Sequence, residues 1–192
     1  MSNNIYAAPE SDLQNAVGDD TKAAFYVVSE TKFLIMFLTT FGIYSIYWFY
    51  KNWNNYRHSS GENCWPVPRG IFAIFFVHSL FRHIAQKNAL QEHRVNWNHE
   101  AQAGLIVFLL LARNILDRLA QKSMGSPWTD ILLIVLLFPL ALSLKKAQSA
   151  INTACNDPDG ASNAKLGVAN FIWIGLGIIL WALLFIGMFV DA

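Results

Sequence analysis

Long runs of apolar residues alternate with short polar stretches along most of the chain. Lys32 and Lys51 bracket 18 uncharged residues, and the stretch 166–190 holds 25 more. At about 1.5 Å per residue, helices of these lengths extend roughly 27 and 37 Å, enough to cross a hydrocarbon core of about 30 Å. A third apolar run lies between them. These runs predict membrane-spanning helices at about 33–50, 128–145 and 166–190.

Two shorter apolar runs, 70–81 and 101–112, each hold 12 residues. A run of this length gives about 18 Å of helix, which suits an interfacial or re-entrant helix as well as a span whose flanking arginines snorkel. We expect helices at about 70–84 and 103–120, and both readings stay open for them. The sequence therefore predicts an all-α fold, a polytopic helical membrane protein with four to five membrane-associated or spanning helices in a single domain, 25–192.

The stretch 1–24 has a different character, because it is polar and carries four acidic residues. It lacks the basic start, apolar centre and cleavage site of a secretory signal. It also offers too little apolar surface to offset the entropy lost on ordering. We expect a retained, disordered N-terminal tail.

Tyrosine and tryptophan residues gather in the second half of the first apolar run. Such side chains prefer the headgroup level of a bilayer, where one end of the ring is apolar and the other is wet. The pattern predicts an interfacial aromatic belt near residues 48–56, with a buried aromatic core as the alternative. The belt residues are Tyr44, Tyr47, Trp48, Tyr50 and Trp53.

Composition supports a membrane location. Apolar residues make up 54% of the chain and charged residues only 14%, with a formal net charge of +1. Soluble domains carry about 25% charged residues. These values argue against a disordered chain and against a nucleic-acid binder with a basic face, and they favour the lipid bilayer as the main partner. The only cysteines, Cys64 and Cys155, are too few for a disulfide scaffold and are expected to be free thiols.

The distribution of basic residues gives an orientation. If all five helices cross, the N-terminal side holds eight lysines and arginines and the other side six. If 70–81 only lies in the interface, the division becomes nine against five and the N-terminus changes sides. Cytoplasmic loops are the more basic ones. Both divisions place the C-terminus outside.

Three charged residues and one histidine are candidates for a polar site at or near membrane depth. Arg113 and Asp117 are four residues apart, so they can pair on one helix face. Such a pair can line a pathway or join two helices, unless the helix has already left the hydrocarbon there. Asp130 falls in the first turn of its helix, where the dipole favours an anion, so capping is the favoured role over that of a buried acid. His78 lies inside the 70–81 run.

Motifs with defined chemistry are missing from the sequence. The five histidines are separated by 20, 5, 10 and 6 residues, and none of these spacings places two imidazoles on one metal ion. The sequence also has no phosphate-binding loop, nucleophile elbow or Cys-x-x-Cys pair. We therefore expect no metal, no cofactor and no enzymatic activity.

The run 40–53, TFGIYSIYWFYKNW, has the form Thr-x-Gly-x-Tyr-x-x-Tyr-Trp-Phe-Tyr-Lys-Asn-Trp. It resembles a family of bacterial membrane proteins known chiefly as a domain of unknown function, whose members are sometimes loosely labelled permeases. The resemblance implies a multi-pass protein of the bacterial inner membrane and supplies no catalytic or binding residues. The permease label is not adopted, because large facilitators have about 12 helices. Weaker similarities lie at Pro66, Arg69, Phe72, Gln148, Asn152 and Asn170.

These patterns lead to two functional hypotheses. The first is a non-enzymatic membrane scaffold or partner subunit, which would contact another membrane protein or a second copy of itself. The second is a small channel or transporter that uses Arg113, Asp117 and Asp130.

Overall fold

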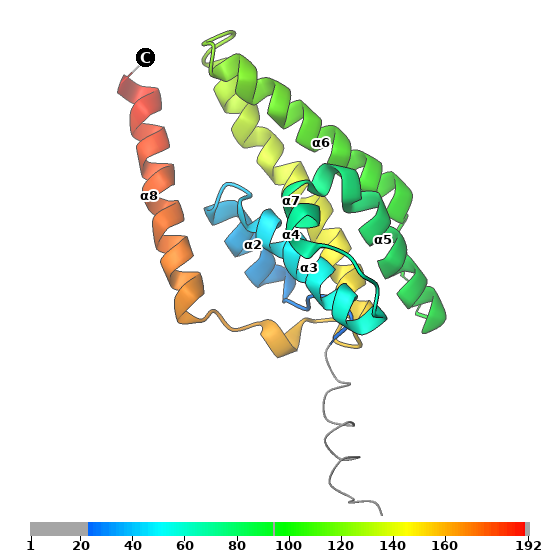
Figure 1. Ribbon diagram of the computed structural model, residues 1–192. Helices are drawn as coiled ribbons and strands as arrows, with labels where there is room; N and C mark the ends of the chain where they lie inside the picture. Colours follow the sequence, from blue (N-terminus) through cyan, green and yellow to red (C-terminus); the bar gives the residue numbers. More distant parts are fainter. Residues whose placement is uncertain (1–22, 94, 191–192) are drawn as a thin grey trace, which may run out of the picture.

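The computed structural model describes residues 23–93 and 95–190, so most of the predicted N-terminal tail lies outside the described residues (Figure 1). Over these residues the chain is all-helical, as the sequence predicts. Its elements are α2 (Glu30–Thr39), α3 (Tyr44–Ser60), α4 (Pro66–Ile71), α5 (Ala73–Leu90), α6 (His99–Ala120), α7 (Trp128–Ala154), the 3₁₀ turn η1 (Ala161–Asn163) and α8 (Val168–Val190).

The single helix predicted at 33–50 is wrong, because α2 and α3 meet at a turn over 40–43. The turn places Phe41 and Gly42 at φ 54° and 86°, and the Gly42 N–H bonds to the Phe37 carbonyl at 2.8 Å. Thr40 strengthens it, since its hydroxyl donates to the Met36 carbonyl at 2.7 Å and accepts from the Tyr44 N–H at 3.1 Å. Glycine tolerates positive φ without the Cβ penalty, which makes this the natural breaking point.

The other four helices occur near their predicted positions with shifted ends. Helix α5 follows a break at Phe72, whose ψ of 41° separates it from α4. Helix α6 starts where the Asn98 side chain accepts the Ala101 N–H at 3.0 Å. Helix α7 continues past Pro139 to Ala154, well beyond its predicted end at 145.

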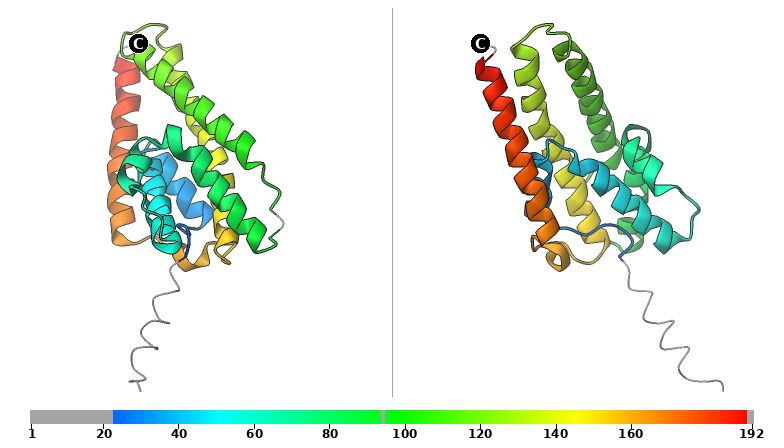
Figure 2. Two further views of the ribbon diagram at one scale, coloured as in Figure 1. Left: turned by 45° about the vertical axis from the view of Figure 1, so that its right-hand side comes forward. Right: turned by 60° about the vertical axis from the view of Figure 1, so that its left-hand side comes forward.

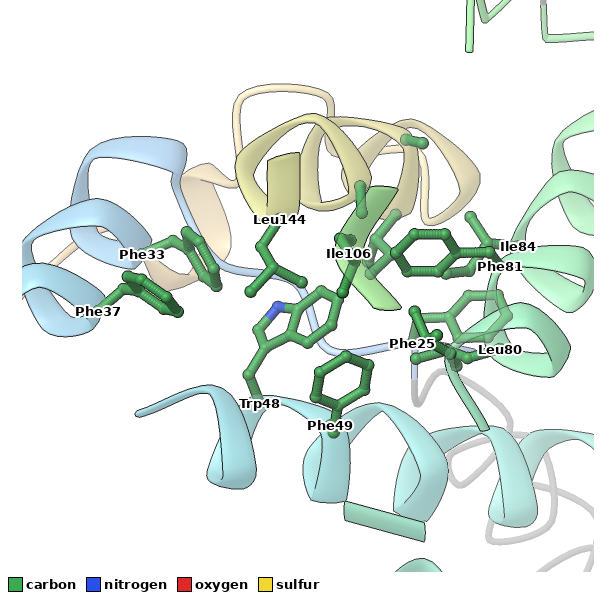
Figure 3. Close-up of a cluster of buried hydrophobic side chains, with 14 of the residues drawn as sticks. Phe25, Phe33, Phe37, Trp48, Phe49, Leu80, Phe81, Ile84, Ile106 and Leu144 are labelled. Atoms are coloured by element: carbon green, nitrogen blue, oxygen red, sulfur yellow. The ribbon is translucent and has the colours of Figure 1, made fainter. Parts of the chain in front are cut away.

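Helices α6 and α7 form a long antiparallel hairpin, and α2 and α5 pack against the second half of α7 (Figures 1 and 2). Helix α3 meets α7 through the hydrogen bond between the Trp48 and Gln148 side chains. Side chains from several helices meet in one apolar core. In Figure 3 the Trp48 ring lies between α3 and α7, close to Leu144 and Phe49. Phe33 of α2 packs edge-on against the same indole, at 5.8 Å between ring centroids.

A buried set of amides fixes the extended segment that precedes α2. Gln148 accepts the Trp48 indole N–H and donates to the Tyr26 carbonyl at 3.1 Å. Asn152 donates to the Val28 carbonyl at 3.0 Å, and Asn52 accepts the Tyr26 N–H at 3.0 Å. Buried polar groups cost free energy unless they are paired, so these bonds let the polar backbone of this extended segment pass through an apolar core.

Among the described elements, helix α8 contacts α2 along one narrow seam. Gly177 lies so close to the Thr39 carbonyl that a Cβ there would come within 2.1 Å of its oxygen. The Trp181 indole donates to the Leu38 carbonyl at 3.1 Å and stacks on Phe41 at 4.1 Å. Figure 1 shows the rest of α8 standing apart from the bundle.

By length and composition, α7 and residues Val168–Gly187 of α8 are the described helices that could cross a membrane. Only 6% of the most apolar stretch of α8 is buried within the protein, compared with 33% for α7.

Candidate functional site

The connection between α6 and α7 brings the predicted charged residues together. It spans only residues 121–127, so the end of α6 and the start of α7 lie side by side (Figure 2). Arg113 and Asp117 come from the last third of α6, and Asp130 comes from the first turn of α7. All three line one pocket.

The pocket has a volume of about 1010 Å³ and lies between the α6–α7 hairpin and the end of α8. Phe41, from the turn between α2 and α3, also lines it. The lining is polar near the 121–127 turn and apolar farther from it. The polar lining residues are Arg113, Asn114, Asp117, Ser123, Ser126 and Asp130, and the apolar ones include Leu110, Leu133, Ile134, Leu137 and Leu184.

The predicted Arg113–Asp117 ion pair does not form among the described residues. Arg113 instead reaches across to α7, where its Nη1 donates to the Leu133 carbonyl at 3.1 Å. Asp117 accepts from Gln121 Nε2 at 2.7 Å. The ion pair is absent because the half-buried Arg113 guanidinium lies beside α7 and bonds to a backbone carbonyl of that helix. The exposed Asp117 bonds instead to Gln121, at the end of its own helix.

Asp130 lies in the first turn of α7, as predicted, but it caps no backbone N–H in the described chain. Its Oδ2 accepts the Ser126 hydroxyl at 3.1 Å, and Pro127 occupies the cap position. The carboxylate lies in the first turn of α7, at the positive end of the helix dipole. Its partner is thus a side chain that also lines the pocket.

His78 does not join this site. It is exposed on α5, while the pocket is lined by α6, α7, α8 and the turn at Phe41. The sequence placed it at membrane depth because it interrupts an apolar run, but the run itself belongs to a different part of the fold.

The predicted aromatic belt is largely wrong. Trp48 and Trp53 are 0% exposed and Tyr44 only 7%, so these three belong to the core. Tyr50 is half-buried, and Tyr47 is 46% exposed. The spacing contains the missed signal: Tyr44, Trp48 and Asn52 recur every four residues and form one buried helix face.

Sequence reasoning also missed a polar aromatic cluster between α3 and α5. Tyr56 donates to Glu62 Oε1 at 2.7 Å, and its ring stacks on His83 at 4.3 Å. Burial lowers the pKa of His83 below its usual 6.5 and raises the pKa of Tyr56 to about 12. Arg69 covers the Trp53 ring at 4.3 Å. The members come from four segments, so no local spacing could reveal the cluster.

Both cysteines are free thiols. Cys64 lies 3.9 Å from the Trp53 carbonyl and Cys155 lies 3.8 Å from the Phe25 carbonyl. Burial raises the pKa of each thiol, which disfavours the reactive thiolate. Among residues 23–93 and 95–190, no three His, Cys, Asp or Glu side chains are grouped so that they could hold a metal ion.

Comparisons of the chain with models of known protein families, with curated proteins and with solved structures give no match. The resemblance carried by residues 40–53 therefore stays a prediction from the sequence.

Proposed function

We propose that the protein is an integral membrane protein in which α6, α7 and α8 cross the bilayer. The observation that carries this proposal is the surface of α8, which over residues 171–187 is apolar on every face and touches the described bundle only along its seam. Fully exposing one such side chain to water costs about 1.5–3 kcal/mol relative to burying it. Over residues 168–187, α8 exposes eleven large apolar side chains: Val168, Phe171, Ile172, Trp173, Leu176, Ile178, Ile179, Leu180, Leu183, Phe185 and Ile186.

Helix α6 is not one of the two helices that qualify by length and hydropathy together, and we add it as the third crossing on its length and its exposed apolar side chains. Its 22 residues extend about 33 Å, and Leu105, Phe108, Leu111 and Ile115 are exposed along it. Its deepest charge, Arg113, donates to a backbone carbonyl, as intramembrane charges commonly do.

Two other segments enter the bilayer from one surface and return to it. One is the turn between α2 and α3, where Ile43 and Ile46 are exposed. The other is the junction of α4 and α5, with Ile71, Phe72 and Phe75 exposed. The 70–81 run is thus re-entrant, and Cys64 and Cys155 lie on the same side of the membrane.

The charge distribution supports an outside location for the end of α8. Arg113, Arg118 and Lys122 lie near the 121–127 turn, at the same end as the last turns of α8 (Figure 1). The positive-inside rule places the more basic end in the cytoplasm, and the resemblance suggests a bacterial inner membrane. The other described basic residues lie in α2 to α5, in the second half of α7 and in the loop before α8: Lys32, Lys51, Arg57, Arg69, Arg82, Lys87, Lys145, Lys146 and Lys165.

The proposed role is a non-enzymatic partner subunit that offers α8 to a helix of another membrane protein or of a second copy. Opposite the seam, α8 carries a stripe whose members alternate four and three residues apart, the spacing of a left-handed helix pair. Small residues allow close approach within it. The stripe consists of Val168, Ile172, Gly175, Ile179, Ala182 and Ile186.

A matched pair of photo-crosslinkers tests this role in native membranes. Ile179 lies on the stripe and Ile178 beside it, and both are 57% exposed. A crosslinking residue at 179 should give a protein adduct, while one at 178 should give lipid adducts. Lipid adducts at both positions would contradict the partner role and leave the membrane location standing.

A small channel or transporter is the second candidate, favoured by the charged pocket between three proposed spans. Proteoliposomes would be assayed for proton and monovalent-ion flux with the wild type, Asp117→Asn and Asp130→Asn. Flux in the wild type that falls in both variants would support this candidate, and no flux in the wild type would exclude it.

A further inference from the structure

We infer that the pocket between α6, α7 and α8 binds a phospholipid whose headgroup carries a primary ammonium, as phosphoethanolamine does. The phosphate would lie at Arg113, and the ammonium between Asp117 and Asp130. This inference rests on the proposed membrane location, and it adds a ligand class to the pocket.

The charges are arranged in the order that such a headgroup needs. Arg113 bonds at the level of Leu133, three residues farther along α7 than Asp130, which is about 4.5 Å deeper. Asp117 is four residues closer to the end of α6 than Arg113, or about 6 Å along the axis. The cation is therefore inner and the two carboxylates are outer. In a bilayer the phosphate of this headgroup is attached to the glycerol and its ammonium extends toward water, so phosphate meets guanidinium and ammonium meets carboxylate.

Hydrogen-bonding capacity remains free at each charge. Arg113 uses one Nη1–H for the Leu133 carbonyl, and a guanidinium has five N–H donors. Asp117 and Asp130 each accept one bond at Oδ2, from Gln121 and Ser126. Within the described chain, the Oδ1 atom of each carboxylate accepts none. A primary ammonium with three donors can bridge both.

The deeper part of the pocket suits an acyl chain. Leu110, Leu137, Leu184 and Phe41 line it. Nearer the 121–127 turn, Gly187 in the last turn of α8 leaves that wall of the pocket open. A Cβ at Gly187 would meet no atom within 4 Å, so the wall has space there. The volume of about 1010 Å³ is at the upper end for a small-molecule site, which leaves room for a headgroup and the first part of a chain.

The same charges argue against the other common headgroups. A glycerol headgroup has a phosphate but no cation, so the two carboxylates would repel it. A choline headgroup has no N–H to donate, and its usual recognition depends on aromatic faces around the trimethylammonium. Among the described residues that line the pocket, Phe41 is the only aromatic one, and it comes from the turn between α2 and α3 rather than from the polar end near residues 121–127.

Native mass spectrometry of the full chain in mild detergent tests this inference. Phosphatidylethanolamine, phosphatidylcholine and phosphatidylglycerol with identical chains would be titrated in turn. We expect the ethanolamine lipid to bind at least about tenfold more tightly than the other two, and soluble phosphoethanolamine to compete only weakly, because it lacks the chains. Equal binding of the three lipids, or full competition by the soluble headgroup, would overturn the inference.

Variants connect the binding to the named residues. Asp117→Asn combined with Asp130→Asn should remove the preference for ethanolamine while leaving choline-lipid binding unchanged. Arg113→Gln should weaken all three phospholipids. Arg118→Gln is the control, because Arg118 is exposed on the same helix and does not line the pocket. An unchanged preference in the double variant would also overturn the inference.

Alkaline extraction of native membranes tests the membrane location independently of the lipid site. A chain that stays in the membrane pellet but binds the lipids without preference contradicts only the lipid site. A chain that is extracted without detergent contradicts the membrane location and, with it, the lipid site.

Discussion

Trp48 and Trp173 carry the same side chain but lie in two regions with very different surroundings. Trp48 of α3 is 0% exposed, packed by Phe33 and Phe49, and its indole N–H bonds to Gln148. Trp173 of α8 is 53% exposed among apolar neighbours. Around Trp48 the protein supplies both the apolar packing and the polar partner. Around Trp173 the described part of the protein supplies no hydrogen-bond partner and little packing, and the proposed lipid environment of α8 accounts for this difference.

The contrast teaches that apolar content alone does not separate a core from a membrane span. The two regions differ in where the polar groups are. The core around α3 and α7 contains buried amides that bond to one another and to the backbone, whereas residues 171–187 contain no polar side chain other than the Trp173 and Trp181 indoles. Four predictions probe this difference.

The largest effect is expected from Gln148→Leu. The change leaves the Trp48 indole N–H and the Tyr26 carbonyl without their partner, and each unsatisfied buried group costs about 1–3 kcal/mol. The free energy of unfolding in detergent should fall by about 2–4 kcal/mol. Gln86→Leu, at an exposed position on α5, should change it by less than about 0.5 kcal/mol. Similar losses in both variants would mean that the amide set does not hold the core.

The next effect concerns the α8 seam. In Gly177→Ala the new Cβ would collide with the Thr39 carbonyl, while the same change at Gly175 meets no atom within 4 Å. Gly177→Ala should lower stability by about 1–3 kcal/mol and increase hydrogen exchange across α8, with the core helices unchanged. Gly175→Ala should leave exchange as in the wild type. Equal exchange in both variants would contradict the observed seam.

A smaller effect depends on pH. Burial holds the pKa of His83 below 6.5 in the folded protein, so the unfolded chain binds more protons as the pH falls. The stability contributed by neutral His83 is complete above pH 6.5 and is lost as the pH falls through the folded pKa. Thermal unfolding between pH 7.5 and 5 should show this loss in the wild type and less of it in His83→Gln. The control His78→Gln, at an exposed position, should retain the wild-type pH profile. A flat profile in His78→Gln would show that His78, and not His83, causes the loss of stability.

The smallest effect is expected at Asp157, in the exposed loop before η1. Backbone N–H donors, with Ser162 first and then Ala161, hold the pKa of this carboxyl below 3.8. The stability it contributes is complete above pH 3.8 and is lost as the pH falls through the folded pKa. Asp157→Asn should therefore weaken the acid dependence of unfolding near pH 3–4. If Asp157→Asn left the acid dependence of unfolding unchanged, the hydrogen bonds that Asp157 accepts would not measurably stabilise the folded protein.

Much of the fold follows from the sequence because apolar length is a local property. The uncharged run 166–190 predicts α8 almost to its ends, and the run after Pro127 predicts the start of α7. The break at Phe41–Gly42 was missed since the surrounding apolar run continues across it. Its stabilising bonds, such as Thr40 to Met36, form only after the chain turns.

The candidate site was predictable in part. Arg113, Asp117 and Asp130 stand out as charges beside long apolar runs, and a connection of seven residues implies that α6 and α7 lie together. The acceptor of Arg113 could not be predicted, because Leu133 contributes a backbone carbonyl that any residue would offer. The buried position of Trp48 depends on α2 and α7, which are distant in the sequence, so aromatic composition alone suggested a belt.

The most direct test of the central claim is the accessibility of a spin label at Ile178 of α8, in a chain with both cysteines replaced by serine and reconstituted into vesicles. If lipid surrounds α8, the label should collide more often with dissolved oxygen than with a water-soluble nickel chelate, and the reverse should hold at exposed Arg57 of α3. Chelate access at Ile178 equal to that at Arg57 would contradict a lipid environment for α8.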